Sequence, residues 1–286
     1  MSILFSGDFH AGALGELSYI TKKTLIKKHG PEKYNNIRYH IILGDGGFLW
    51  QGNHNTDLFN FKVLANRHFP VLCVIGNHEP ILGMSNLPET DIGIGETVYQ
   101  INADPFVAYL KRGKVYTIDE FKFLVLGGAL SIDKDDRKHN KSWWEKEYWT
   151  EQEKRDLFKL LESEKIFDCV LSHTGPNHIN KLLFKDPKYF SKIRDDEVAR
   201  LNDQIAEGIQ YRKWWCGHWH RDLYHDVPNE DREYYYLYKT TKILDRVDNK
   251  MTVYNEYNKS DRLSIISEYF NNNFFSSRCY FFYCHL

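Results

Sequence analysis

Six short apolar segments of the chain are each followed by glycine or polar residues, and this recurrence limits the folds that the chain can adopt. The segments are 2–6, 39–43, 71–75, 123–126, 169–171 and 214–216. Short, mostly continuous apolar runs rich in β-forming residues are typical of strands buried on both faces. Such strands belong to layered α/β domains, in which polar residues at the carboxyl ends of the strands form the site.

Helical patterns lie between some of these segments. We expect a helix over residues 16–29, because the pattern stops at Gly30, and a second helix within 195–209. Thr150 and Glu153 have the spacing of a capping box, which predicts the start of a third helix. With the apolar segments, these helices predict an α/β fold with a buried sheet.

A β-hairpin is expected over residues 115–126, with its turn near Asp119 and Glu120. The chain has 286 residues, of which 42% are apolar. A chain of this length is able to bury a substantial core. Length alone is compatible with one large domain or two small ones.

The polar residues that follow the apolar segments are drawn from aspartate, asparagine and histidine. They are Asp8, His10, Asp45, Asn77, His78, His173, His218 and His220. Their oxygen and nitrogen atoms are donors that suit zinc, manganese or iron. A turn or a structural histidine would explain any one of these positions, but not five segments that share one set of donors. The pattern therefore predicts a site for two metal ions.

The order of these residues resembles the signature of the calcineurin-like metallophosphoesterase family. The matching motifs are Asp8-x-His10, Gly44-Asp45, Gly76-Asn77-His78-Glu79, His173 and Gly217-His218-x-His220. The resemblance implies a two-sheet β-sandwich flanked by helices, in four layers α/β/β/α, with a dimetal site at the carboxyl ends of the strands. It implies a metallophosphoesterase domain over residues 1–250 and leaves 251–286 as an apolar C-terminal extension.

The resemblance also implies a role for each position, with Asp45 bridging two metal ions. One ion would be bound by Asp8, His10 and His220, and the other by Asn77, His173 and His218. A hydroxide that bridges the ions would attack phosphorus, and His78 would donate a proton to the leaving oxygen. The expected cofactors are two divalent transition metal ions, manganese, iron or zinc, with manganese favoured.

The segment 127–137 and the following Trp143-Trp144 resemble one branch of the same family. Arg137 is a candidate for holding a substrate phosphate through two hydrogen bonds, and a surface loop with an ion pair is an equal alternative. The tryptophans at 143, 144, 214 and 215 have the chemistry to stack on a base, but tryptophan more often forms core or pocket wall.

Hydrolysis of a phosphate ester, phosphatase-like and on a phosphorylated small molecule or nucleotide, is the implied activity. A phosphodiesterase or nuclease is the alternative, because Phe48 stands where the family's protein phosphatases carry a second aspartate. The balance of 38 basic and 39 acidic residues does not favour nucleic acid or a membrane as partner. A non-catalytic binding module is a remote alternative, because the signature has lost no ligand.

Five cysteines without paired spacings predict no disulfide framework. The first residues do not form a signal peptide, and no apolar run reaches the length of a membrane span. We therefore expect a cytoplasmic protein. The aromatic segment 251–286 has no counterpart in the resemblance, and an added strand, a disordered end and a contact in a homo-oligomer stay open for it.

Overall fold

The fold is described from a computed structural model. The residues it describes are 2–10, 20–48, 61, 64, 67–79, 84, 86–131, 137, 139, 143, 147–185, 196–228, 230–248 and 250–255. Of the predicted extension 251–286, residues 256–286 lie outside the described residues. Trp144 also lies outside them. Within the described ranges, no helix is both long enough and apolar enough to cross a membrane.

The first sheet has eight strands in the order β14-β13-β1-β2-β3-β6-β5-β4. Its strands are β1 (Ser2–Ser6), β2 (Ile37–Ile42), β3 (Val71–Cys73), β4 (Glu89–Thr90), β5 (Val98–Ala103), β6 (Phe106–Tyr109), β13 (Thr241–Val247) and β14 (Lys250–Tyr254). Strands β1, β2, β3 and β6 are parallel. The carboxyl ends of these four strands therefore lie at one edge of the sheet.

The second sheet has six strands in the order β11-β12-β10-β9-β8-β7. Its strands are β7 (Lys114–Ile118), β8 (Phe121–Val125), β9 (Cys169–Leu171), β10 (Lys213–Cys216), β11 (Leu223–Val227) and β12 (Arg232–Tyr236). Strands β8, β9, β10 and β12 are parallel. This sheet also presents several carboxyl ends at one edge.

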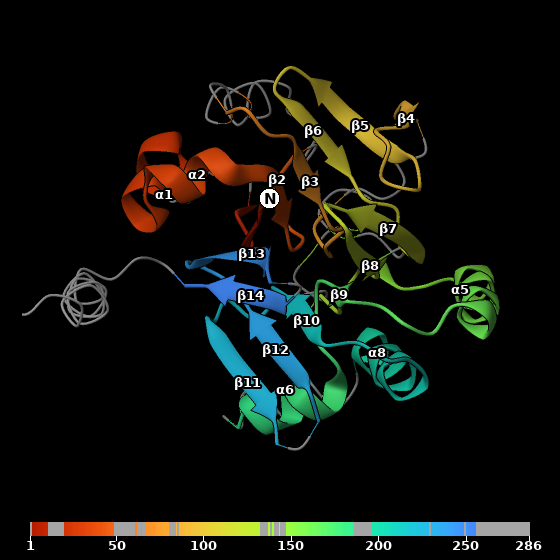
Figure 1. Ribbon diagram of the computed structural model, residues 1–286. Coiled ribbons are helices and arrows are strands. Elements are labelled where there is room, and N and C mark those ends of the chain that lie inside the picture. Colours follow the sequence, from red (N-terminus) through yellow and green to blue (C-terminus); the bar gives the residue numbers. More distant parts are fainter. Residues whose placement is uncertain are drawn as a thin grey trace, which may run out of the picture.

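Helices cover the outer face of each sheet. They are α1 (Lys22–His29), α2 (Pro31–Asn36), α5 (Glu151–Ser163), α6 (Asn177–Leu183) and α8 (Glu197–Gly208). Leu25 of α1 and Tyr34 of α2 pack with Leu4 on the first sheet. Helices α5, α6 and α8 pack on the second, at the opposite side of the molecule (Figure 1). The layers are α/β/β/α, which confirms the predicted architecture.

A shared apolar core joins the inner faces of the two sheets. Phe5 of the first sheet stacks on Trp215 of the second, with ring centroids 4.3 Å apart and an interplanar angle of 7°. Trp215 in turn stacks on Tyr235 at 4.2 Å. Trp214 has no solvent exposure and packs on the helical side of the same sheet. Both tryptophans are therefore core residues, the more frequent role for this residue type.

The structure confirms the six predicted strands and the hairpin of β7 and β8. Asp119 and Glu120 form its turn with φ values of 51° and 69°, the left-handed conformation that suits the right-handed twist of a hairpin. Helix α5 begins with the predicted capping box, in which Thr150 accepts from the Glu153 amide and the Glu153 side chain reaches back to the Thr150 amide.

The first predicted helix begins later than expected. Helix α1 starts at Lys22 because Thr21 is extended, with φ −65° and ψ 153°, and its hydroxyl accepts from the Thr24 amide. An extended N-cap residue ends any helix that approaches from the N-terminal side. The expected start at residue 16 is therefore wrong as a continuous helix, and residues 11–19 lie outside the described ranges.

Candidate metal centre

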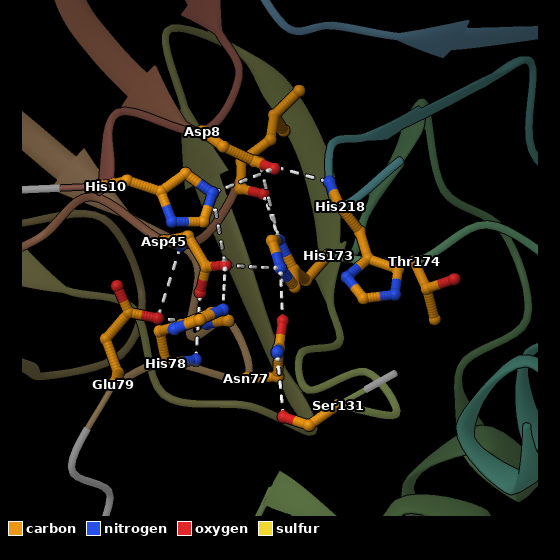
Figure 2. Close-up of polar contacts among 12 residues, drawn as sticks. Asp8, His10, Asp45, Asn77, His78, Glu79, Ser131, His173, Thr174 and His218 are labelled. Carbon is orange, nitrogen blue, oxygen red and sulfur yellow. Dashed lines mark hydrogen bonds and ion pairs between the residues drawn. The ribbon is translucent and has the colours of Figure 1, made fainter. Parts of the chain in front are cut away.

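The predicted site residues follow the carboxyl ends of parallel strands from both sheets. They are Asp8 and His10 after β1, Asp45 after β2, Asn77 and His78 after β3, His173 after β9, and His218 and His220 after β10. Because the two sheets face each other, these strand ends lie close together. Figure 2 shows the side chains that converge there, among them Asp8, Asp45 and His173. The topology thus brings together residues up to 212 positions apart in sequence.

Asp8, His10 and His220 form the first set of donors, which we call the outer group. His10 Nε2 and His220 Nε2 lie 2.7 Å apart, and His220 Nε2 lies 3.3 Å from Asp8 Oδ2. The histidine side chains are 21% and 48% exposed, whereas the Asp8 side chain is fully buried. Asp8 Oδ2 accepts no hydrogen bond from the described residues. A buried carboxylate oxygen of this kind favours a cation as its partner.

Asp45, Asn77 and His173 form the second set, which we call the inner group. His173 Nε2 lies 2.9 Å from Asn77 Oδ1 and 3.3 Å from Asp45 Oδ2. His173 Nδ1 lies 2.8 Å from the Leu43 carbonyl oxygen, which accepts its proton. In the neutral ring, Nε2 is then a lone pair that faces two other acceptors. All three side chains of the inner group are almost completely buried.

Asp45 faces both groups. Its Oδ2 lies 3.3 Å from His173 Nε2 and 3.9 Å from His10 Nε2. The same oxygen lies 3.7 Å from His78 Nε2, and the His78 amide donates to Asp45 Oδ1 at 3.0 Å. Asp45 thus lies within 3.9 Å of histidines from the outer and the inner group.

Arg137 approaches the site on the side of His78. Its two terminal nitrogens lie 3.0 and 2.7 Å from the two ring nitrogens of His78. The His78 side chain is 15% exposed. The structure therefore brings the predicted substrate-binding arginine next to the predicted proton donor.

His218 lies differently from the other predicted ligands. Its backbone amide donates to Asp8 Oδ1 at 3.1 Å, while its ring lies beside the His173 ring, with centroids 5.1 Å apart. Among the described residues, the convergent groups of three histidine or carboxylate donors include Asp8, His10, Asp45, His78, His173 and His220, but not the His218 ring.

The backbone at the site is strained. His10, Asp45, His218 and His220 have φ values of 43°, 49°, 67° and 49°. Non-glycine residues rarely adopt this left-handed conformation, which is concentrated at functional sites. The preceding Gly44 has φ 88°, and a Cβ there would lie 2.1 Å from His173 Nδ1. Glycine is therefore required for Asp45 and His173 to approach each other.

Neighbouring groups of opposite charge shift the pKa values of His173 and Asp45. Burial opposes charge on His173, but the carboxylates of Asp45 and Asp8 outweigh it and raise the pKa of His173 to about 10. Burial likewise acts against ionisation of Asp45, yet His173, His78 and His10 hold its pKa well below the ordinary range. The inner group therefore demands one positive charge near His173 Nε2, which either a proton or a metal ion satisfies.

The residues present fit divalent transition metal ions. The Asp8 oxygen without a hydrogen bond, the facing imidazole nitrogens of His10 and His220, and the acceptors around His173 all favour cations. The donor set mixes carboxylate, amide and imidazole, as zinc, manganese and iron sites do. Asp8, His10 and His220 would hold one ion and Asn77 and His173 the other, with Asp45 between them.

Comparison with known proteins identifies the family. The model of the calcineurin-like phosphoesterase family matches residues 1–222. The chain belongs to the calcineurin-like phosphoesterase family. Among curated proteins, no match is found.

Solved structures similar to this chain are distant from it in sequence. One crystal structure has a TM-score of 0.52 and 11% identity, covering 90% of this chain and 99% of its own. GAP50, the anchor in the inner membrane complex of Plasmodium, has a TM-score of 0.48 and 10% identity, covering 93% and 94%. Phosphopantetheinyl hydrolase (PptH) from Mycobacterium tuberculosis has a TM-score of 0.45 and 12% identity, covering 83% and 90%. At these identities the first shows a shared fold, and none indicates a substrate.

Sequence reasoning missed how Glu79 supports the site of this phosphoesterase. Its carboxylate accepts from the backbone amides of Gly76 at 2.6 Å, Gly46 at 2.9 Å and Asp45 at 3.2 Å. Glu79 thus ties the turn after β2 to the turn after β3. It is the last residue of the Gly-Asn-His-acid motif, so its place in the motif was the available signal.

Ser131 and Glu147 are also near the site and were not predicted. Asn77 Nδ2 donates to Ser131 Oγ at 2.9 Å, and Ser131 Oγ donates to Glu147 Oε2 at 2.5 Å. Ser131 lies in the segment that resembles one branch of the family, which was the only sequence signal for it. Nothing in the spacing connects Glu147 to Asn77.

Proposed function

We propose that the chain is a metal-dependent phosphoesterase of the phosphatase type, with two divalent transition metal ions, manganese favoured. The observation that supports this most is the inner group, where His173 Nε2 lies 2.9 Å from Asn77 Oδ1 and 3.3 Å from Asp45 Oδ2. Three acceptor atoms so close together need a positive charge between them. Membership of the calcineurin-like phosphoesterase family makes a phosphate ester the natural substrate.

When bound, two such ions activate water at neutral pH and neutralise the charge of the phosphoryl group. The side chains of this chain position the ions and the ester. Asp45 faces both groups of donors, so it fixes their spacing. Arg137 lies beside His78, where its guanidinium would hold a phosphoryl oxygen.

His78 is the proposed proton donor to the leaving oxygen. Burial is the main cause that lowers the pKa of His78, to about 4; Asp45 opposes this and Arg137 adds to it. In the protein without metal or substrate, His78 is therefore neutral at pH 7. A phosphate dianion held by Arg137 would bring negative charge beside His78 and raise this pKa, because an opposite charge favours imidazolium. Binding of the substrate would therefore shift His78 toward the protonated form that a proton donor needs.

Phosphorylated small molecules or nucleotides are the substrate class that we favour over nucleic acid. The chain has 38 basic and 39 acidic residues. Nucleic-acid enzymes generally hold the phosphate backbone through an excess of basic residues on one face. A nuclease would need that excess to come from a local patch.

A substrate panel tests the proposal. The metal-stripped protein with added Mn²⁺ is assayed on an aryl monoester, an alkyl monoester, a nucleoside monophosphate, a diester, a cyclic nucleotide and single-stranded DNA. We expect hydrolysis of at least one monoester, faster than of any diester, and none after chelation. Faster cleavage of DNA or the diester would replace the phosphatase with the nuclease alternative. Full activity in protein that elemental analysis shows to be metal-free would overturn the proposal.

A further inference from the structure

Glu147 is a buried carboxylate that the proposed reaction does not use. It has no solvent exposure. Its Oε1 accepts from the indole of Trp143 at 2.7 Å and from the Ser131 amide at 3.2 Å, and its Oε2 accepts from Ser131 Oγ at 2.5 Å. Within the described ranges it forms no ion pair with a basic side chain. A carboxylate in such a place is costly to bury, which suggests a role beyond packing.

Ser131 connects Asn77 to Glu147 through two hydrogen bonds, and both donate toward Glu147. An ionised carboxylate can only accept, so the single proton of the Ser131 hydroxyl points to Glu147. The Ser131 oxygen is then left to accept from Asn77 Nδ2, at 2.9 Å (Figure 2). The other end of the same amide, Asn77 Oδ1, faces His173 Nε2 at 2.9 Å.

We propose that Glu147, acting through Ser131, is a positioning residue that keeps the oxygen of the Asn77 amide turned toward the inner metal ion. The inference rests on the proposed function, in which Asn77 is a ligand of that ion. An amide turned by 180° would present its NH₂ group, which has no lone pair for a cation. Partners of metal ligands typically contribute about 10–100-fold to metal affinity.

Glu147→Gln reverses this direction with little change in shape. The new amide keeps its oxygen for Trp143 and the Ser131 amide and turns its NH₂ group to Ser131 Oγ. The hydroxyl proton then points to residue 77, and the Asn77 oxygen turns away from the inner group to accept it. We expect Mn²⁺ affinity at one of the two sites to fall about tenfold or more, with the other site changed less than about threefold.

Asn77→Asp supplies the matched background, because a carboxylate has an oxygen at both ends. In that background Glu147 and residue 77 compete for the single proton of Ser131, and Glu147→Gln relieves the competition. We therefore expect Glu147→Gln to cost less than about threefold in Mn²⁺ affinity, or to improve it, when residue 77 is aspartate. A merely structural role for Glu147 would give the same loss in both backgrounds, since coupling appears only between residues that act together.

The experiment is calorimetric titration of the metal-stripped full chain with Mn²⁺ for the wild type, both single variants and the double variant. Glu153→Gln is the control: it removes a carboxylate that pairs with Arg112 and caps α5, and it should keep both Mn²⁺ affinities. Two ions on the wild type with equal losses from Glu147→Gln in both backgrounds would overturn this inference alone. A wild type that binds no Mn²⁺ would overturn the proposed function and the inference with it. If Glu147→Gln fails to fold, Ser131→Ala enters the same cycle with the same expectations.

Discussion

Both groups of the candidate metal centre contain carboxylate and imidazole donors, but their histidines differ in burial. In the outer group the His220 and His10 side chains are 48% and 21% exposed, whereas the His173 side chain of the inner group is fully buried. Buried donors that are oriented by fixed partners lose little freedom on binding and are shielded from water. We infer that the inner group binds its ion more tightly and that the outer group exchanges its ion more readily.

Substitution of Asp45 should weaken metal binding by the outer and the inner group together. Asp45 Oδ2 faces His173 and His10, so Asp45→Asn weakens both sites together. We expect turnover to fall by about 10³-fold or more, because each metal contributes several kcal/mol to the reaction. Metal content by elemental analysis should fall from two ions toward none. Asp203→Asn, at a surface pair with His178, is the control, and loss of a single ion from Asp45→Asn would contradict a bridging position.

Comparison of His173→Ala with His220→Ala sharpens the contrast. His173→Ala removes a fully buried donor and leaves Asp45 and Asn77 facing a cavity, so turnover should fall about 10²-fold and excess Mn²⁺ should not restore it. His220→Ala removes an exposed donor that water replaces, so a loss of about tenfold should be largely restored by millimolar Mn²⁺. Equal rescue of the two variants would remove the distinction between the groups.

His78 belongs to neither group of donors, so its substitution tests proton donation separately from metal binding. A nitrophenolate leaves without a proton, whereas an alkoxide needs one, so His78→Ala should cost about 10²-fold on an alkyl ester and less than about threefold on an aryl ester. Metal content should stay at the wild-type value, although His78 Nε2 lies 3.7 Å from Asp45 Oδ2. Equal losses on both esters, with both ions bound, would make His78 a residue that positions phosphate. Loss of an ion would make it a ligand.

The smallest expected effect is the dependence of stability on pH in the metal-free protein. The pKa of His173 is raised from 6.5 to about 10, opposed by burial and driven by Asp45. A raised folded pKa stabilises fully below about pH 6.5, and this contribution is lost as pH rises through about 10. The melting temperature should therefore fall between pH 7 and pH 10 by at least about 3 °C, the shift that ~1 kcal/mol produces in a chain of this size.

His173→Gln is the reference for this measurement, because it cannot hold the proton, and its melting temperature should change less over the same interval. Saturating Mn²⁺ should also flatten the wild-type profile, since the ion takes the place of the proton on Nε2. Parallel profiles for the variant and the metal-free wild type would show that the charge of His173 does not contribute to stability.

Sequence patterns predicted the buried parts of the fold better than its edges. Strands such as β1 and β9 are apolar on both faces, so composition alone identifies them. Strand β11 is Leu-Tyr-His-Asp-Val at the edge of the second sheet and partly exposed, and β4 has only two residues. Such strands are formed by pairing with neighbours and have little signal of their own. Helix α1 starts later than the apolar pattern indicates because Thr21 is an extended N-cap residue.

For the site, the sequence indicated which residues gather but not how they are oriented. The strand-end positions of Asp8 and Asp45 follow from the topology, and the structure places both there. The His218 ring lies beside the His173 ring. This placement depends on the left-handed backbone of His218, which no residue spacing reveals. Glu147 reaches Asn77 only through Ser131, across a segment with no regular period.

The position of the site across the two sheets has a consequence for how long the protein survives. Asp45 follows β2 of the first sheet and His173 follows β9 of the second, so an ion held between them would link the two sheets, which only the folded chain brings together. An ion that binds the folded chain alone stabilises it by about 2.7 kcal/mol when present at 100 times its dissociation constant. When the metal is scarce, the protein would lose its activity and would also unfold and be degraded by proteases more often. The amount of protein in the cell would then depend on the metal concentration.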